Sequence, residues 1–496
     1  MESAAGTSMR RNIIMNKRRN IEVLLSLLPV VILIIMLATV IRVFGADSLN
    51  GGSQVSLLIA AGICCAIAML YFRIPWKDLE EGIKRNVGSV TTAIIILLMI
   101  GAISGVWILS GVVPTLIHYG LMLIHPKFFL VTTCLICAIV SVLTGSSWST
   151  IATIGIALLG IGQAQGFNSG LIVGAIISGA YFGDKMSPLS DTTVLASTMS
   201  DVPLFSHIRY MMYTVVPTMV ITLTIFTIIG LSYSVSDATL INLYQQLLQE
   251  HFNLSPWLMV VPILTILMIV KKWPAVIVLF LSSLLGAIFA LIFQPHILAE
   301  VAGTTEINAY SQFVGVMRGM YDITAIDMGH PQVSDLVSTR GMTGMLNTIY
   351  LILCAMCFGG VMTSSGMLQR ITQLILPFTR TRTSLVASTV STGFFMDCMV
   401  ADQYLSIILT ANMFKGVYHR RGYEERLMSR SIEDSATVTS PLIPWSSCGM
   451  TQATILGVPT LTYLPYCFFN IISPLMSIMV AAIGYKIFKK KEVATH

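Results

Sequence analysis

Residues 178–197, SGAYFGDKMSPLSDTTVLAS, place two aspartates and a lysine near the centre of one long apolar stretch. On an insertion scale, each of Asp184, Lys185 and Asp191 costs about 2.5 to 3.5 kcal/mol in lipid, so these side chains must face protein or water. Carboxylate, hydroxyl and backbone carbonyl oxygens are hard ligands that suit Na⁺, and a carboxylate can bind a proton instead. The segment therefore predicts a site where a small cation and a proton compete.

Two prolines are expected to break the helices that carry these groups. The tripeptide SPL occurs at 187–189 and again at 440–442. Proline removes a backbone donor and clashes with the preceding helical turn, so we expect breaks at Pro188 and Pro441. The freed carbonyls and half-helix ends are oriented dipoles that can help to hold an ion at membrane depth.

Other carboxylates and hydroxyls accompany the breaks. We expect Na⁺ to bind at Asp184, Asp191 and Asp397, where Asp397 lies at the tip of a second polar interruption. Asp434 either joins this site or marks the cytoplasmic interface. The full set of predicted ion-binding and proton-coupling residues is Asp184, Asp191, Thr192, Asp397, Ser146, Ser147, Ser440 and Asp434.

Lys185 has two interpretations. As a structural residue it pairs with Asp184, Asp191 or Asp397 and holds the broken helix in place. As a functional residue it displaces Na⁺ or contacts an anionic substrate. The sequence alone leaves both open.

The composition indicates a chain embedded in lipid. Of 496 residues, 55% are hydrophobic and only 10% charged, and the mean hydropathy is +0.81, so no stretch remains for a soluble catalytic domain. We therefore expect no enzyme activity and no cofactor. The basic residues fall in short loops, which argues against nucleic-acid binding and follows the positive-inside rule with both termini cytoplasmic. The cysteine pairs with CxxC spacing lie inside apolar runs and are expected to be packing residues.

Apolar runs predict ten spanning helices. They lie near 21–43, 54–72, 88–113, 170–199, 207–232, 255–270, 275–294, 344–366, 431–458 and 459–486. Two more segments, 128–163 and 384–413, are interrupted by TGSSWST and TGFFMDCMVADQ and are predicted to be re-entrant helical hairpins. The predicted fold is thus an all-α polytopic membrane protein.

Three short motifs occur in the same order in the two halves of the sequence. GVWILSG at 105–111 matches GVMTSSG at 360–366, TG at 144–145 matches TG at 392–393, and the SPL tripeptides match each other. Since the matched helices run in opposite directions, we expect inverted repeats, as in many secondary transporters. The predicted organisation is a cytoplasmic segment 1–20, a first repeat 21–232 with hairpin 128–163, an external connection 233–254, a second repeat 255–486 with hairpin 384–413 and external loop 295–343, and a cytoplasmic tail 487–496.

The string GDKMSPLSDTT, with TGSSWST before it and the second SPL after it, resembles the NhaC family of sodium/proton antiporters over the whole chain. The resemblance implies a multi-pass exchanger of the bacterial inner membrane, working by alternating access and often dimeric. Some members of the family exchange malate for lactate, so a sodium- or proton-coupled organic acid exchanger remains an alternative. An ion channel or receptor-like scaffold is a further alternative from another class.

Overall fold

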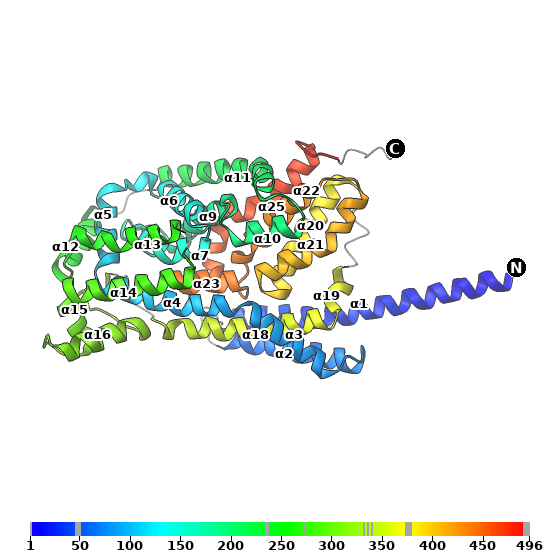
Figure 1. The fold of residues 1–496 in the computed structure, drawn as a ribbon, viewed down its shortest axis with the longest axis horizontal. Coiled ribbons are helices and arrows are strands. Elements are labelled where there is room, and N and C mark those ends of the chain that lie inside the picture. The colour runs from blue at the N-terminus through cyan, green and yellow to red at the C-terminus, as the bar shows by residue number, and fades with distance from the viewer. Residues whose placement is uncertain are drawn as a thin grey trace.

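The computed structural model describes residues 2–44, 51–233, 238–271, 273–330, 333–334, 337–338, 341–372 and 379–489. This part of the chain is built from helices and contains no β-strand (Figure 1). Nine of its helices are long and apolar enough to cross a membrane, or eleven if each of two bent helix pairs is one span. Their outward faces carry large apolar side chains such as Leu24, Ile139 and Ile292, as a lipid solvent requires. The prediction of an all-α polytopic membrane protein is confirmed.

The remaining helices include long spans and shorter helices that connect them. Outside the hairpins and the broken helices, the chain forms α1 (Glu2–Phe44), α2 (Gly52–Leu70), α3 (Trp76–Ser89), α4 (Thr91–Leu109), α5 (Val112–Leu123), α11 (Leu204–Ser232), α13 (Val260–Val270), α14 (Ala275–Phe293), α18 (Leu346–Ser364), α19 (Met367–Thr372), α24 (Thr460–Tyr463) and α25 (Phe468–Ile483).

Two helical hairpins approach each other from opposite directions. The first consists of α6 (Phe129–Thr144), α7 (Ser147–Thr150), a π-helical turn and α8 (Ile156–Ala164), and the second of α20 (Arg382–Val400) and α21 (Gln403–Arg420). In Figure 1, α6 lies toward the left end, α20 and α21 lie toward the right, and α7 and α10 lie between them. Both tips line one cavity, so the hairpins meet inside the protein and do not pass each other.

The second hairpin is longer than predicted. Its arms cover Arg382–Arg420 rather than 384–413, and its turn falls at Ala401 and Asp402. Asp397 is therefore not at the tip, because α20 continues for three more residues to Val400. The first nine residues of TGFFMDCMVADQ, 392–400, belong to α20, where Thr392 and Asp397 are buried by protein, and only the last three reach the turn and the start of α21.

The turn positions also correct the internal alignment. Gly145 ends α6 with a φ of 68°, and Ala401 ends α20 with a φ of 60°, so the two left-handed residues are equivalent. Ala401 lies 256 residues after Gly145, whereas Gly393 lies inside α20. The match of the two TG dipeptides was wrong. The residue that corresponds to Gly145 is the one with the same left-handed backbone conformation, Ala401, and not the glycine at 393.

Capping residues repeat at the same spacing. Ser146 and Asp402 each cap a helix by accepting a hydrogen bond from the backbone N–H three residues later. Ser190 and Ser446 do the same after the two SPL tripeptides. These pairs support an internal repeat. The boundaries predicted for its halves stay predictions.

Both SPL tripeptides lie at interruptions. The first separates α9 (Ser169–Met186) from α10 (Asp191–Met199). The second forms a short 3₁₀ turn between α22 (Glu425–Ile432) with its π-helical extension Glu433–Thr437 and α23 (Ser447–Leu456). Ser187 precedes Pro188 and Ile443 precedes Pro444, and both have the extended backbone that a following proline favours. Pro441 itself lies within the 3₁₀ turn, so the second helix ends two residues after it.

Close packing of α6 on α9 holds the first break beside its hairpin. A Cβ on Gly183 would lie 2.4 Å from the carbonyl oxygen of Ala138, so the two backbones touch there. Such small-residue contacts are the usual way for helices to approach in lipid. Cys134 and Cys137 lie in the same contact as buried free thiols, in keeping with a packing role.

Three segments predicted as loops contain helices. The basic segment 73–85 is mostly α3, which leads into α4 with only Val90 between them. The external loop 295–343 contains α15 (Pro295–Ala302) and α16 (Ala309–Tyr321), and the connection 233–254 contains α12 (Ala238–His251). These helices are amphipathic and too polar for a hydropathy window. Lys272 and the end of the predicted tail, 490–496, lie outside the described residues.

Candidate ion-binding site

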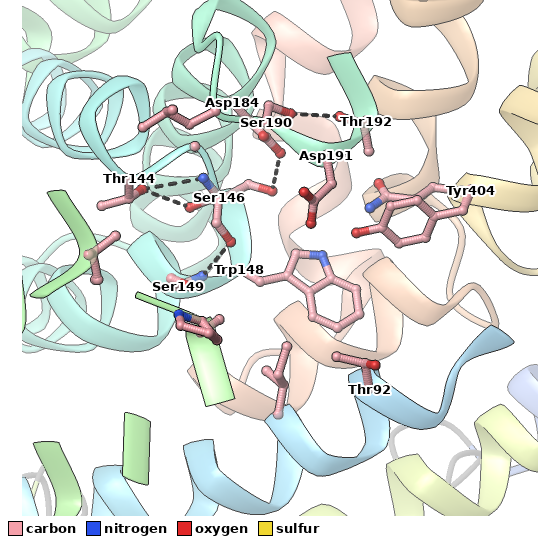
Figure 2. A pocket seen from close by; sticks show the side chains of 18 of the residues that line it. Thr92, Thr144, Ser146, Trp148, Ser149, Asp184, Ser190, Asp191, Thr192 and Tyr404 are labelled. Atoms are coloured by element: carbon pink, nitrogen blue, oxygen red, sulfur yellow. Dashed lines mark hydrogen bonds between the residues drawn. The ribbon is translucent and has the colours of Figure 1, made fainter. Parts of the chain in front are cut away.

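A cavity of about 650 Å³ lies where the two hairpin tips meet the first helix break (Figure 2). One wall comes from the first tip, 144–149, and another from the second tip, 402–404. The break itself contributes 189–192, and the N-terminal ends of α4 and α14 close the remaining side. Five of the predicted site residues line this space: Ser146, Ser147, Asp184, Asp191 and Thr192.

Asp184 is held at the wall of the cavity by the first hairpin. It lies in the last turn of α9, is 5% exposed, and its Oδ2 accepts a hydrogen bond of 2.8 Å from the Ser147 hydroxyl. Because Ser147 is the first residue of α7, the position of this carboxylate depends on the hairpin turn. A hydroxyl donor leaves the carboxylate charge intact and free to bind a cation.

Asp191 projects from the opposite side of the break. It is the first residue of α10 and, unlike Asp184, is exposed to the cavity. Figure 2 shows its carboxylate pointing into the space that the Trp148 indole and the Tyr404 ring border. The neighbouring Ser190 and Thr192 hydroxyls lie 3.0 Å apart. The break thus places two carboxylates and several hydroxyls around one space.

Asp402 is a lining carboxylate that sequence reasoning did not select. It caps α21 by accepting from the Leu405 N–H at 3.0 Å, and the Ser447 hydroxyl lies 3.3 Å from its Oδ2. It is 3% exposed. Tyr404 and Trp148 line the cavity as well. The internal repeat could have identified Asp402, because Asp402 occupies the same position in the second hairpin tip as Ser146 does in the first.

Asp397 and Ser440 do not line the cavity. Oδ2 of Asp397 accepts a hydrogen bond of 2.8 Å from the Thr439 hydroxyl, while its Oδ1 has no partner among the described residues. Ser440 lies in the 3₁₀ turn and contacts Ser446. The described residues contain no group of three acidic, histidine or cysteine side chains arranged to hold a metal, so Asp397 does not complete a three-carboxylate set with Asp184 and Asp191.

Lys185 forms a buried ion pair with Asp434. Both side chains are fully buried, and the Ser473 hydroxyl lies 3.3 Å from each of them. None of the three partners expected for Lys185 is used, and Asp434 is buried in the protein interior. The pair connects α9 to the π-helical turn before the second break, so it ties the two broken helices together.

Glu433 reinforces the same junction. Its Oε2 accepts from Thr437 at 2.8 Å, and its Oε1 lies 3.3 Å from the Thr193 hydroxyl. The Thr193 hydroxyl also lies 3.4 Å from the carbonyl oxygen of Asp184 and 3.3 Å from that of Lys185, in the last turn of α9 before the break. π-Helical turns often occur at functional sites, and this one directs two acidic side chains at the first broken helix.

The interior contains more acidic than basic groups. Among the described residues, the buried ionisable side chains other than histidine, cysteine and tyrosine are Asp184, Asp397, Asp402, Glu433, Asp434, Lys185 and Arg430. Lys185 is paired with Asp434, and the Arg430 guanidinium stacks over the Tyr210 ring and has no hydrogen-bond partner among the described residues. The remaining carboxyl groups are balanced only by binding a proton or a cation.

The sequence of this chain is similar to those of known transporters over most of its length. The model of the Na⁺/H⁺ antiporter family matches residues 4–181 and 179–485. The chain is 34% identical over 425 residues to the Na⁺/H⁺ antiporter NhaC of Bacillus subtilis, covering 85% of this chain and 91% of the relative. It is 36% identical over 418 residues to the malate-2H⁺/Na⁺-lactate antiporter of the same species, covering 84% and 86%.

A further relative is the arginine/ornithine antiporter ArcD of Halobacterium salinarum. It is 31% identical over 469 residues, which cover 94% of this chain and 93% of the relative. The matches extend from the first helix to the last and include both hairpins and both breaks. This chain is an integral membrane protein and belongs to the Na⁺/H⁺ antiporter family.

Proposed function

We propose that this chain is a secondary transporter that exchanges sodium ions for protons, with Asp184 and Asp191 as the carboxylates that bind each ion in turn. Ser146, Ser147 and Thr192 supply neutral oxygen ligands, and Asp402 adds a third carboxylate to the cavity. The observation that carries this proposal is a cavity that both hairpin tips line, with the carboxylates Asp184, Asp191 and Asp402 and no basic side chain among its described lining residues.

Competition follows from the electrostatics of this site. An uncompensated carboxylate in the protein interior is costly, and either a proton or Na⁺ removes the cost. Both cannot occupy the same oxygen atoms, so an ion released on one side of the membrane leaves the group ready for the other ion. Family membership supports this reading, since the relative from Bacillus subtilis is named a Na⁺/H⁺ antiporter.

Alternating access requires the cavity to face each side in turn. We propose that the hairpins and both broken helices move as one unit. Lys185–Asp434 and Thr193–Glu433 connect the two broken helices, and the hydrogen bonds Ser147–Asp184 and Thr439–Asp397 connect each of them to a hairpin. The membrane is the bacterial inner membrane, with both termini cytoplasmic as the loop charges indicate. We also propose a homodimer, which mass measurement of the purified protein in lipid nanodiscs tests.

The decisive experiment uses purified protein in vesicles with an internal pH dye. Addition of Na⁺ outside should change the internal pH in wild-type vesicles and not in Asp191→Asn vesicles. Thr198→Ala, an exposed position on α10 outside the cavity, is the matched control. Normal sodium-driven proton movement in Asp191→Asn would remove that carboxylate from the mechanism, and a wild-type protein that moves no protons would end the proposal.

The alternative is an organic acid exchanger of the malate/lactate type, which a relative's name supports. The cavity favours it less, because no lysine, arginine or histidine is among its described lining residues. Of the two buried lysine and arginine side chains among the described residues, Lys185 is paired with Asp434 and Arg430 stacks over Tyr210, and neither lines the cavity. Malate or lactate that accelerates proton movement in the same vesicles would favour the alternative, and indifference to both acids supports sodium/proton exchange.

A further inference from the structure

The cavity is much larger than one sodium ion needs. Its volume of about 650 Å³ lies within the range of roughly 300 to 1,000 Å³ typical of sites for small organic molecules. A site for a bare ion is normally a tight cage of oxygen atoms. The space around Asp191 therefore has room for a cation that carries carbon.

The walls have the chemistry of an ammonium site. The Asp191 carboxylate, the Trp148 indole and the Tyr404 ring face the same space (Figure 2). A carboxylate beside aromatic faces is the usual way for proteins to bind ammonium groups, since the ring faces attract the cation and the carboxylate neutralises it. Three carboxylates and no basic side chain among the described lining residues favour a cation over an organic anion on charge grounds.

Two polar atoms of lining residues are also unused. Gln403 lines the cavity at 3% exposure, and its Oε1 has no hydrogen-bond partner among the described residues. The same holds for Nε1 of Trp148. Unpaired buried polar atoms are uncommon and call for a partner. A hydroxyl group on the ligand can donate to the first and accept from the second after small side-chain movements.

We propose that the cavity also binds a small organic ammonium compound, with its charged head at Asp191 between Trp148 and Tyr404. This inference rests on the proposed function, because the ammonium group uses the same carboxylate as Na⁺ and must compete with it. The aromatic side chains serve the organic cation alone, since Na⁺ takes oxygen ligands. Changes at Trp148 therefore separate the two cargoes.

The test uses choline as the probe and dimethylbutanol, its uncharged carbon isostere, as the control compound. Isothermal titration of the purified wild-type protein without Na⁺ should give saturable heat with choline and none with the isostere. Added Na⁺ should weaken choline binding. Trp148→Ala should weaken it about tenfold, as expected for loss of a cation–π contact.

Trp257→Ala is the matched variant, since Trp257 is 71% exposed and lies away from the cavity. It should bind choline as wild type does. Equal heats for choline and the isostere, or unchanged choline binding in Trp148→Ala, would overturn the inference. Sodium-driven proton exchange is measured separately in vesicles, so wild-type protein that exchanges ions but ignores choline disproves only the ammonium site. Protein that binds choline but moves no protons disproves the proposed exchange.

Discussion

The Lys185 ammonium and the Asp434 carboxylate form an ion pair across the two broken helices, and neither side chain is exposed. The partners are 249 residues apart in the sequence. Each belongs to a helix that ends a few residues later, at Ser187 or in the 3₁₀ turn at Ser440. The pair therefore holds together two helix ends that have lost part of their own backbone hydrogen bonding.

Removal of either partner should destabilise the protein. Lys185→Met or Asp434→Leu leaves one charge buried without its partner, which typically costs about 3 to 5 kcal/mol. We expect a clear fall in the thermal unfolding midpoint in detergent for each single variant. The double variant Lys185→Met with Asp434→Leu should recover most of that loss. A double variant as unstable as the sum of the singles would show that the pair contributes more than charge balance.

Asp184→Asn should abolish sodium-dependent proton movement while the protein still folds. The amide has the same shape and can still accept from Ser147, but it neither carries a proton at neutral pH nor balances a cation. Vesicle flux and the unfolding midpoint are measured together. Ser147→Ala keeps the carboxylate and should weaken sodium affinity about tenfold to a hundredfold without abolishing exchange, since a hydrogen bond to a charged group contributes about 1.5 to 3 kcal/mol.

Asp402→Asn separates capping from charge. Asparagine caps helices about as well as aspartate, so α21 should keep its N-terminus and its stability. The lining charge is lost, and we expect a higher sodium concentration for half-maximal exchange. Asp397→Asn, outside the cavity, should change that concentration less. A larger effect at Asp397 than at Asp402 would place sodium at the carboxylate that the cavity excludes.

Gly145→Ala should disable the first hairpin. Gly145 has a φ of 68°, and an added Cβ would lie 2.6 Å from the backbone carbon of Leu189 at the helix break. Strain and collision should displace the tip from Asp184 and reduce exchange. Ala401→Gly is the matched change at the equivalent turn, where alanine already has a φ of 60°. It should be tolerated, because glycine relieves the left-handed strain.

Hydropathy and proline positions predicted the helical class, both breaks and five of the cavity residues. Apolar length and the cost of charge in lipid are properties of the residues themselves, so a single sequence shows them. The partner of Lys185 was not predictable in this way, because Asp434 comes near it only through the packing of two interrupted helices. Charge alone suggested Asp184, Asp191 or Asp397 as the partner of Lys185. In the structure the partner is Asp434.

The second hairpin shows a different limit. Asp397 and Asp402 differ by five positions, yet only Asp402 lines the cavity. The deciding residue is Ala401, whose left-handed conformation ends α20. A non-glycine residue in that conformation has no clear sequence signature, whereas Gly145 does. Equivalence between the halves was therefore visible only once both turns were known.

The link between α9 and α10 is four residues long, from Ser187 to Ser190, and Asp184 and Asp191 stand on either side of it. A small rotation in this link changes the spacing of the two carboxylates without unwinding either helix. Sodium grips several oxygen atoms at once, whereas a proton needs only one. Bound Na⁺ should therefore bring the two carboxylates closer together, and a bound proton should let them move apart. The conformation of the link between α9 and α10 would then depend on which ion is bound.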